Sequence, residues 1–147
     1  MSSKAAVARM VGKISADNSA MLLCDVQERF RSLIHHGETV IRTSKLLTSA
    51  SKELNIPLVI TEQYPKVFGP TIRDCFEDES HLQSTPTFPK KLFSMMTPEV
   101  SEHIKSLNAT SFILFGIETH VCVQQTALDL LEVRYKNRLG ACFELLL

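Results

Sequence analysis

The sequence predicts an α/β fold of three layers, in which helices cover both faces of a parallel, Rossmann-like sheet. Short continuous apolar runs, such as residues 20–24 and 111–115, are typical of strands that are buried on both faces. Longer segments between such runs, such as residues 37–54, repeat apolar side chains at helical spacing. Because strand signals alternate with helix signals, crossover connections should keep the strands parallel.

Local signals define the individual elements. Residues 37–54 carry their apolar side chains on one helical stripe, and Thr97 followed by Pro98 is a favourable helix start. Residues 62–70 contain proline and glycine and should form a loop, whereas residues 71–84 are polar and give no clear assignment. We expect strands at residues 20–24, 57–61, 90–96 and 111–115, and helices at residues 37–54, 98–107 and 123–131.

Composition limits the classes of protein to consider. A chain of 147 residues with 44% hydrophobic content fits one domain with its own core. Sixteen basic and sixteen acidic side chains give zero formal charge, which argues against a nucleic acid or a membrane surface as partner. No apolar run has the length of a membrane span. The four cysteines show neither a CxxC pair nor zinc spacing, so we expect free thiols and a cytoplasmic location: Cys24, Cys75, Cys122 and Cys142.

The first 15 residues are basic and contain no acid. They fit either a mitochondrial transit peptide or a frayed, solvated terminus, and we favour the second interpretation. Residues 1–17 are therefore expected to form a flexible N-terminus.

Two residues with reactive side chains follow predicted strands. Asp25 ends the first strand, and Cys122 follows the fourth strand through Gly116 into the first turn of a helix. Free N–H groups and the helix dipole favour a thiolate at such a turn. Because sites in parallel sheets form at the carboxyl ends of strands, a carboxylate base and a thiol nucleophile should meet there. Alternatively, Asp25 is a helix N-cap and Cys122 a buried structural cysteine.

Four segments of the chain, in the same order and at sensible spacing, resemble the isochorismatase-like hydrolase family, and most of all its eukaryotic isochorismatase domain-containing members. The resemblance runs from about residue 20 to residue 132 and implies a three-layer α/β fold with an Asp, Lys, Cys triad. By motif, the triad residues are Asp25, Lys90 and Cys122; Lys90 is preferred to Lys91 because it stands three residues before the Phe93-Ser94 pair. The segments are residues 23–30, 61–66, 89–95 and 115–131.

The resemblance also implies roles for these residues. Lys90 lowers the pKa of the Cys122 thiol, Asp25 accepts the thiol proton, and Cys122 attacks an electrophilic carbon. Backbone N–H groups of the turn from residue 116 to residue 122 should bind the developing oxyanion. The family carries a cis peptide in this turn, which would here join Ile117 to Glu118.

The substrate pocket has four candidate wall residues. Gln27, Phe30 and Phe93 belong to the matching segments, although both phenylalanines could equally belong to the core. His120 either lines the pocket or orients the turn, and we favour lining. Related nicotinamidases bind a metal through an Asp and two His after the second strand, but residues 62–65 contain no histidine. We therefore expect neither metal nor cofactor.

These residues predict a hydrolase that acts on a small-molecule substrate. A cysteine nucleophile suits a carbonyl carbon, so a small amide or related C–N bond is favoured over the vinyl ether of isochorismate. A third hypothesis of another class is a non-catalytic, truncated isoform that binds a partner or a full-length copy. A homo-oligomer is compatible with each of them.

The C-terminal segment departs from the family. The matching domain covers residues 18–134, whereas residues 135–147 form a divergent tail where the family continues with further strands and helices. The sheet is therefore expected to be incomplete at its C-terminal edge. Residues 141–147 either add a small strand to this edge or form an apolar, aggregation-prone tail.

Overall fold

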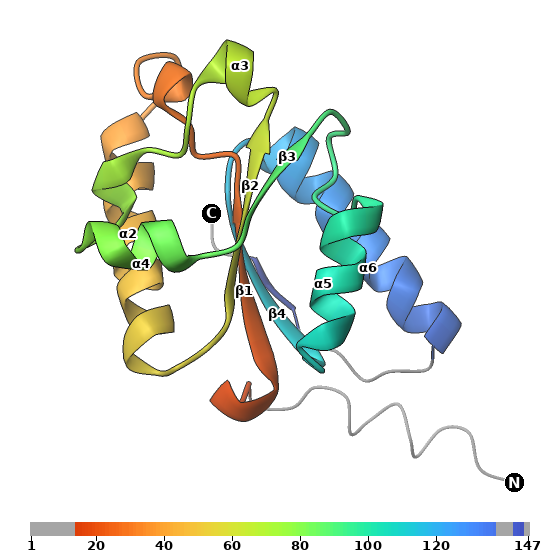
Figure 1. Cartoon of the computed structure of the whole chain (residues 1–147). Coiled ribbons are helices and arrows are strands. Elements are labelled where there is room, and N and C mark those ends of the chain that lie inside the picture. Colours follow the sequence, from red (N-terminus) through yellow and green to blue (C-terminus); the bar gives the residue numbers. More distant parts are fainter. Residues whose placement is uncertain (1–13, 138–142, 146–147) are drawn as a thin grey trace, which may run out of the picture.

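A parallel sheet of five strands runs through the centre of the computed structural model, which describes residues 14–137 and 143–145 (Figure 1). The strand order is β3-β2-β1-β4-β5, and every neighbouring pair is parallel. The strands are β1 (Ser19–Cys24), β2 (Leu58–Gln63), β3 (Thr87–Lys90), β4 (Ser111–Gly116) and β5 (Phe143–Leu145).

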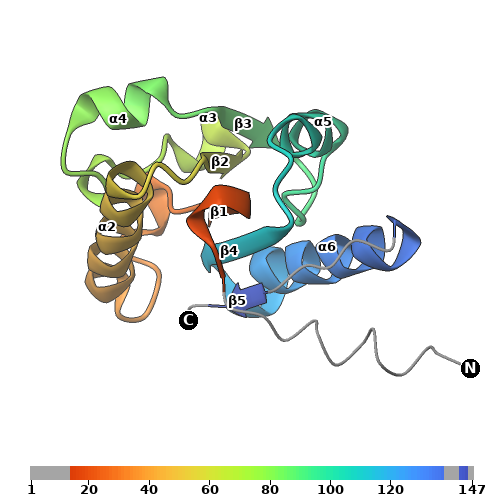
Figure 2. The ribbon, with the colours of Figure 1, turned by 90° about the horizontal axis from the view of Figure 1, so that it is seen from below.

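Helices cover both faces of the sheet, as the alternating pattern predicts. Helices α2 and α4 lie on one face, and α5 and α6 lie on the other (Figures 1 and 2). The α-helices are α2 (Gly37–Glu53), α3 (Pro65–Phe68), α4 (Glu79–Ser84), α5 (Pro98–Ser106) and α6 (Gln124–Asn137). Shorter turns are the 3₁₀ segments Ala16–Asn18, Glu28–Phe30 and Arg73–Cys75, and a π-helical turn, η4 (Thr119–Val123), which leads into α6.

Strand β1 divides the core into two clusters. All six of its residues are buried, as expected for a strand covered on both faces. Leu22 and Cys24 pack in the cluster that includes residues of α5 and α6, whereas Met21 and Leu23 pack in the cluster that includes Ile41 of α2. Because side chains alternate along a strand, the two faces of β1 pack in different clusters of the core.

The predicted strand at residues 90–96 is wrong in its position. Strand β3 instead ends at Lys90, pairing with β2 through residues such as Phe88. The following segment turns its backbone groups toward other partners, because the carbonyl oxygens of Leu92 and Phe93 accept hydrogen bonds from the Lys90 ammonium. The other predicted strands and the helices at residues 37–54 and 98–107 are confirmed within one or two residues, and α6 runs beyond the predicted end at residue 131.

The segments without a clear prediction contain short helices. Helix α3 lies in the expected loop at residues 62–70, and α4 lies in the polar segment 71–84. Asp78 caps α4, because its carboxylate accepts a hydrogen bond of 2.7 Å from the backbone N–H of His81.

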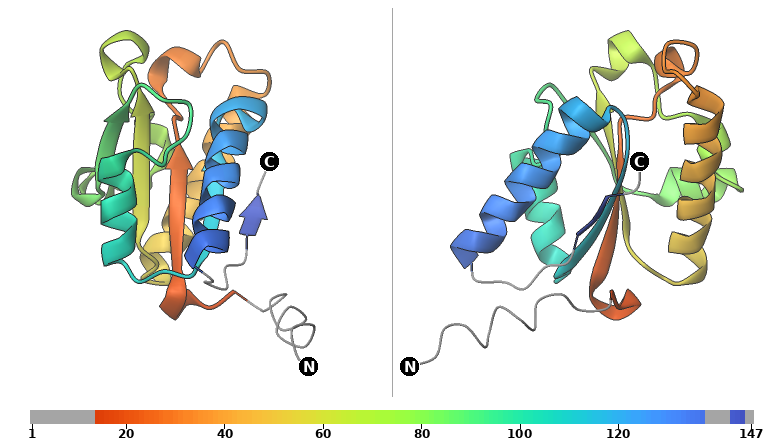
Figure 3. Two further views of the ribbon diagram at one scale, coloured as in Figure 1. Left: turned by 90° about the vertical axis from the view of Figure 1, so that its right-hand side faces the viewer. Right: turned by 180° about the vertical axis from the view of Figure 1, so that it is seen from behind.

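Near the C-terminus, the structure adopts the strand alternative for the tail. Phe143–Leu145 forms β5 beside β4, at the edge of the sheet far from β3 (Figure 3). The divergent tail is otherwise described only to residue 137, and most of the expected flexible N-terminus, residues 1–13, also lies outside the described residues. Within the described part of the chain, no helix is both long enough and apolar enough to cross a membrane.

Candidate active site

The carboxyl ends of three strands bring the predicted triad together. Strand β1 lies between β2 and β4, and successive strands are added on either side of it, so a crevice is expected at this point. Asp25 directly follows β1, Lys90 is the last residue of β3, and Cys122 lies in η4, shortly after β4. All three side chains are buried at the same edge of the sheet.

Asp25 and Lys90 form a buried ion pair. The Asp25 Oδ2 and Lys90 Nζ atoms are 2.6 Å apart, and their side chains are 2% and 0% exposed. The Thr61 hydroxyl donates a hydrogen bond of 2.9 Å to the other carboxylate oxygen. Such a pair is tolerated in a core because each charge has a partner and further hydrogen bonds.

The Lys90 ammonium has three more acceptors. It donates to Gln63 Oε1 at 2.6 Å and to the carbonyl oxygens of Leu92 and Phe93 at 3.0 and 2.8 Å. Lys91, the alternative at the sequence level, is exposed. Hydrogen bonds to strand β2 and to the segment after β3 therefore fix the position of the buried ammonium.

The carboxyl of Asp25 accepts a proton more readily than an exposed one. Burial raises its pKa above the ordinary value, and this effect outweighs the opposing effects of Lys90, Thr61 and the hydrogen bond from Cys122. Asp25 does not cap a helix, since the next turn begins at Glu28 with Gln27 in the N-cap position. Its backbone has a positive φ of 52°, which an aspartate tolerates better than most residues.

The Cys122 thiol is hydrogen bonded to two neighbours. The Cys24 thiol and the Asp25 carboxyl both contact it. The pKa of Cys122 is lowered, mainly by the hydrogen bond from Cys24, with a further contribution from the positive charge of Lys90. Burial raises the pKa of Cys24 well above its ordinary value, so Cys24 stays a neutral thiol and can donate a hydrogen bond to the Cys122 thiolate.

Thr126 ties the backbone at Cys122 to the segment that holds Lys90. Its hydroxyl donates a hydrogen bond of 2.6 Å to the carbonyl oxygen of Cys122 and accepts one of 2.9 Å from the N–H of Met95. The side chain is fully buried. One hydroxyl group therefore joins the turn that contains Cys122 to the segment that follows Lys90.

The turn between β4 and η4 lies against the end of β1. Gly116 has a φ of 123°, and a side chain there would clash with the backbone of Cys24. The next N–H, that of Ile117, donates a hydrogen bond of 2.9 Å to the Cys24 carbonyl oxygen. The peptide bond from Ile117 to Glu118 is cis, at the position that the family resemblance implies.

A cavity of about 310 Å³ opens above Asp25 and Cys122. Its walls are mostly aromatic and aliphatic, and the rings of Phe30 and Phe68 stack with their centroids 4.8 Å apart. The residues that line it are Asp25, Phe30, Gln63, Tyr64, Phe68, Phe93, Ile117, Glu118, Val121 and Cys122.

Two of the four expected wall residues lie outside this cavity. Phe30 and Phe93 line it. Gln27 is instead fully buried, where its amide group bridges the backbone of Gln63 and Gly69 and so fixes the loop after β1. The side chain of His120 is 76% exposed and lies 3.5 Å from the Glu118 carboxylate, so it faces solvent.

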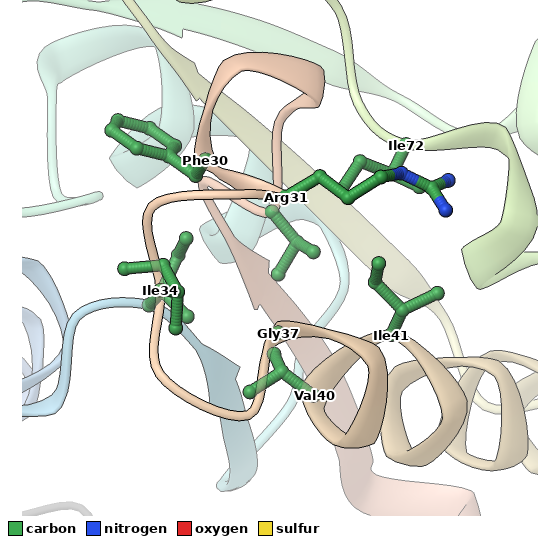
Figure 4. A pocket seen from close by; sticks show the side chains of 9 residues that line it. Phe30, Arg31, Ile34, Gly37, Val40, Ile41 and Ile72 are labelled. Atoms are coloured by element: carbon green, nitrogen blue, oxygen red, sulfur yellow. The ribbon is translucent and has the colours of Figure 1, made fainter.

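A second hollow, of about 10 Å³, lies behind the Phe30 wall, between the loop after β1 and helix α2 (Figure 4). Aliphatic side chains such as Ile34, Val40 and Ile72 surround it, and Arg31 extends its guanidinium away from them. Its volume is about that of one water molecule, so it is a packing defect rather than a ligand site.

Four of the residues around the triad were not singled out from the sequence. Thr61 and Gln63 alternate along the end of β2, within a segment that carries the family resemblance. Thr126 stands four residues after Cys122, where a helical side chain reaches the preceding carbonyl. Cys24 precedes Asp25 directly. Each of these residues could have been identified by its short distance in sequence from a predicted triad residue or by its place in a matching segment.

Comparisons with known proteins agree with this architecture. The isochorismatase domain model matches residues 19–139. The chain is 40% identical over 129 residues to isochorismatase family protein 1B of Dictyostelium discoideum, and the alignment covers 86% of this chain and 63% of that protein. It is 39% identical over 128 residues to isochorismatase domain-containing protein 2 of Xenopus laevis, with 86% and 60% covered.

A solved structure with the same arrangement is that of MAR1 ribonuclease from Caenorhabditis elegans. It superposes with a TM-score of 0.76 at 38% identity, covering 90% of this chain and 65% of that one. The chain thus spans less than two thirds of the length of these relatives.

Proposed function

The chain belongs to the isochorismatase family, and from this membership and the geometry of the site we propose that it is a cysteine hydrolase that cleaves a small amide or related C–N bond. The observation that supports the proposal best is the convergence of Asp25, Lys90 and Cys122 beneath one cavity. The raised pKa of the Asp25 carboxyl and the lowered pKa of the Cys122 thiol bring their proton affinities closer together. A proton can then pass from the thiol to the carboxylate along their hydrogen bond.

The first half of the reaction forms a thioester. Asp25 accepts the proton of Cys122, and the thiolate attacks the carbonyl carbon, so that a C–S bond forms and the carbonyl π electrons move to oxygen. The tetrahedral intermediate then collapses, the C–N bond breaks, and Asp25 returns the proton to the leaving nitrogen. The Lys90 ammonium stabilises the Asp25 carboxylate and the Cys122 thiolate throughout.

Backbone N–H groups of the turn into η4 stabilise the oxyanion. The N–H of Ile117 is already bonded to Cys24 and that of Val121 to the Glu118 carbonyl oxygen. We therefore assign this role to the other N–H groups of the turn, including that of Cys122.

The second half of the reaction releases the acid. Asp25 removes a proton from a water molecule, whose oxygen attacks the thioester carbon, and the C–S bond breaks. The thiolate leaves and takes the proton back from Asp25. The products are a carboxylic acid and an amine, and the enzyme returns to its starting state.

An assay of the purified chain tests the proposal. Small amides are screened by release of ammonia or amine, with isochorismate and a short RNA included as competing substrates. The Cys122→Ala variant should lose turnover by at least about 10³-fold, because the reaction loses its nucleophile. Equal turnover by this variant, with an equally cooperative thermal transition, would overturn the assignment of Cys122. A chain that aggregates and turns over no substrate would favour the non-catalytic isoform instead.

A further inference from the structure

The lining of the active-site cavity carries negative charge only. Asp25 lies at its base and Glu118 at its rim, and among the described residues that line it there is no lysine, arginine or histidine. The Lys90 ammonium does not line the cavity, and Asp25 compensates its charge while three further acceptors surround it. Transfer of the Cys122 proton to Asp25 moves a negative charge within the cavity without changing the sum, so an anionic group that enters the cavity meets repulsion.

The polar groups of the walls offer little to a carboxylate. Both polar atoms of the Gln63 side chain are engaged, since Oε1 accepts from Lys90 and Nε2 donates to the carbonyl oxygen of Lys91 at 3.2 Å. Arginine forks and lysine ammonium groups are the usual partners of a carboxylate substrate. Among the polar side chains of the lining, Gln63 has both heteroatoms engaged, the Tyr64 hydroxyl is a neutral donor, and Glu118 presents an acceptor.

The remaining surface is flat and apolar. The stacked rings of Phe30 and Phe68 form one wall, and Phe93, which is 63% exposed, stands at the opening. A volume of about 310 Å³ lies at the lower end of the range for small-molecule sites. Such a space suits one planar ring or a short branched chain next to the reacting carbonyl.

We propose that the site selects uncharged substrates that carry a small, flat apolar group beside the scissile bond, and excludes substrates that carry a carboxylate. This inference rests on the proposed function, because it assumes that Cys122 is the reacting group. It identifies Glu118 as a specificity-determining residue, which repels anions at the rim of the cavity.

Alkylation of Cys122 measures this selection without knowledge of the natural substrate. Iodoacetamide and iodoacetate are nearly equal in size and differ in charge. We expect the ratio of their rates at Cys122 to exceed the ratio measured on glutathione by about tenfold or more. The assay is run near pH 8 for both reagents. Peptide mapping by mass spectrometry assigns each reaction to Cys122.

Variants at the rim sharpen the test. Glu118→Gln should lower the ratio several-fold, and Glu118→Lys should lower it further, because the repelling charge is first removed and then reversed. A matched pair of amides provides an independent measurement on the unmodified protein. Hydrolysis of 4-methylbenzamide should exceed that of 4-carbamoylbenzoate by about tenfold or more, since the two differ mainly in the charge of one substituent.

The outcomes separate this inference from the proposal on which it rests. A wild-type ratio equal to that of glutathione, with Cys122 still reactive, would overturn the charge selection and leave the nucleophile assignment intact. A Cys122 that reacts with neither reagent would overturn both.

Discussion

Cys75 and Cys122 are buried cysteines in different halves of the core, and their acidities differ in opposite directions. Cys75 belongs to the cluster beneath α2, and burial raises its pKa to about 12. Cys122 belongs to the cluster beneath α5 and α6, and its pKa is lowered although burial acts in the opposite direction. The hydrogen bond from Cys24 and the charge of Lys90 account for the difference.

The contrast teaches that a reactive thiol depends on the polar groups around it. Aliphatic and aromatic side chains such as Ile72 and Phe76 pack around Cys75, and the hydrogen bond with Ser44 and the charge of Arg31 do not offset the effect of burial. The thiol of Cys122 lies where the end of β1 supplies a carboxyl and a second thiol and the end of β3 supplies an ammonium. Only the second arrangement lowers the pKa of its thiol and so favours the thiolate form.

The largest expected effect is the difference in reactivity between these two cysteines. At about pH 7, iodoacetamide should modify Cys122 at least about 10³-fold faster than Cys75, since each pKa unit changes the thiolate fraction about tenfold. The thiolate of Cys122 is present above its folded-state pKa and is lost as the pH falls through it. The pH profile of its alkylation should therefore have a midpoint below 9.0, the ordinary thiol value.

Peptide mapping after timed alkylation measures both rates. In denaturant, the two cysteines should react alike, because the folded environments are gone. A midpoint for Cys122 at or above 9.0 in the folded protein would remove the contrast.

A second prediction concerns removal of the positive charge of Lys90, which helps to distinguish Cys122 from Cys75. Lys90→Met leaves the Asp25 carboxylate buried without its partner, so the free energy of unfolding should fall by about 3–5 kcal/mol near neutral pH. Lys91→Met is the matched control, since this exposed neighbour should change it by no more than about 0.5 kcal/mol. Urea denaturation followed by circular dichroism measures both variants.

The pH dependence of the Lys90→Met effect distinguishes loss of charge from loss of packing. The loss should shrink as the pH falls and Asp25 becomes neutral, because a protonated carboxyl needs no counter-charge. Alkylation of Cys122 should also slow at neutral pH. An equal loss in Lys91→Met, or a loss that does not change with pH, would mean that the ion pair has no special role.

The sequence was sufficient for the parts of the fold that are set by local patterns. The apolar run before Asp25 and the run before Gly116 became β1 and β4, because strands buried on both faces need no alternation. Helix α5 begins at Pro98, as expected, and the Thr97 side chain caps it by accepting a hydrogen bond from the N–H of Val100. Asp25 and Cys122 were found because strand ends meet at one edge of a parallel sheet.

Features that depend on contacts between distant segments were not accessible in this way. The strand predicted at residues 90–96 was misplaced because the carbonyl groups of Leu92 and Phe93 bind the ammonium of Lys90. Lys90 itself came from the family resemblance, because composition alone would place a lysine at the surface. Gln27 belongs to a matching segment, yet its amide joins the end of β2 to the loop at Gly69, and this could not be read from its neighbours in sequence.

A third prediction tests whether Thr126 holds the turn at Cys122 against the segment that follows Lys90. Thr126→Val removes the hydroxyl that joins the Cys122 carbonyl to the Met95 N–H, and it leaves that buried N–H without a partner. The free energy of unfolding should fall by about 1–3 kcal/mol. Thr126→Ser keeps the hydroxyl and should recover most of the rate of Cys122 alkylation. Unchanged stability and rate in Thr126→Val would mean that the hydroxyl does not hold the two segments together.

The smallest expected effect concerns the Cys24 thiol, which donates a hydrogen bond to Cys122. Cys24→Ala removes the hydrogen bond that contributes most to the lowered pKa of Cys122, so the midpoint of the alkylation profile should move to higher pH. At about pH 7 the rate should then fall by up to about tenfold, the change expected for one pKa unit. Cys24→Ser supplies a hydroxyl donor in the same place and should return the midpoint toward that of the unmodified protein. A purely structural role for Cys24 would slow alkylation equally at every pH, whereas loss of the donor slows it only below the midpoint, where the thiolate is scarce.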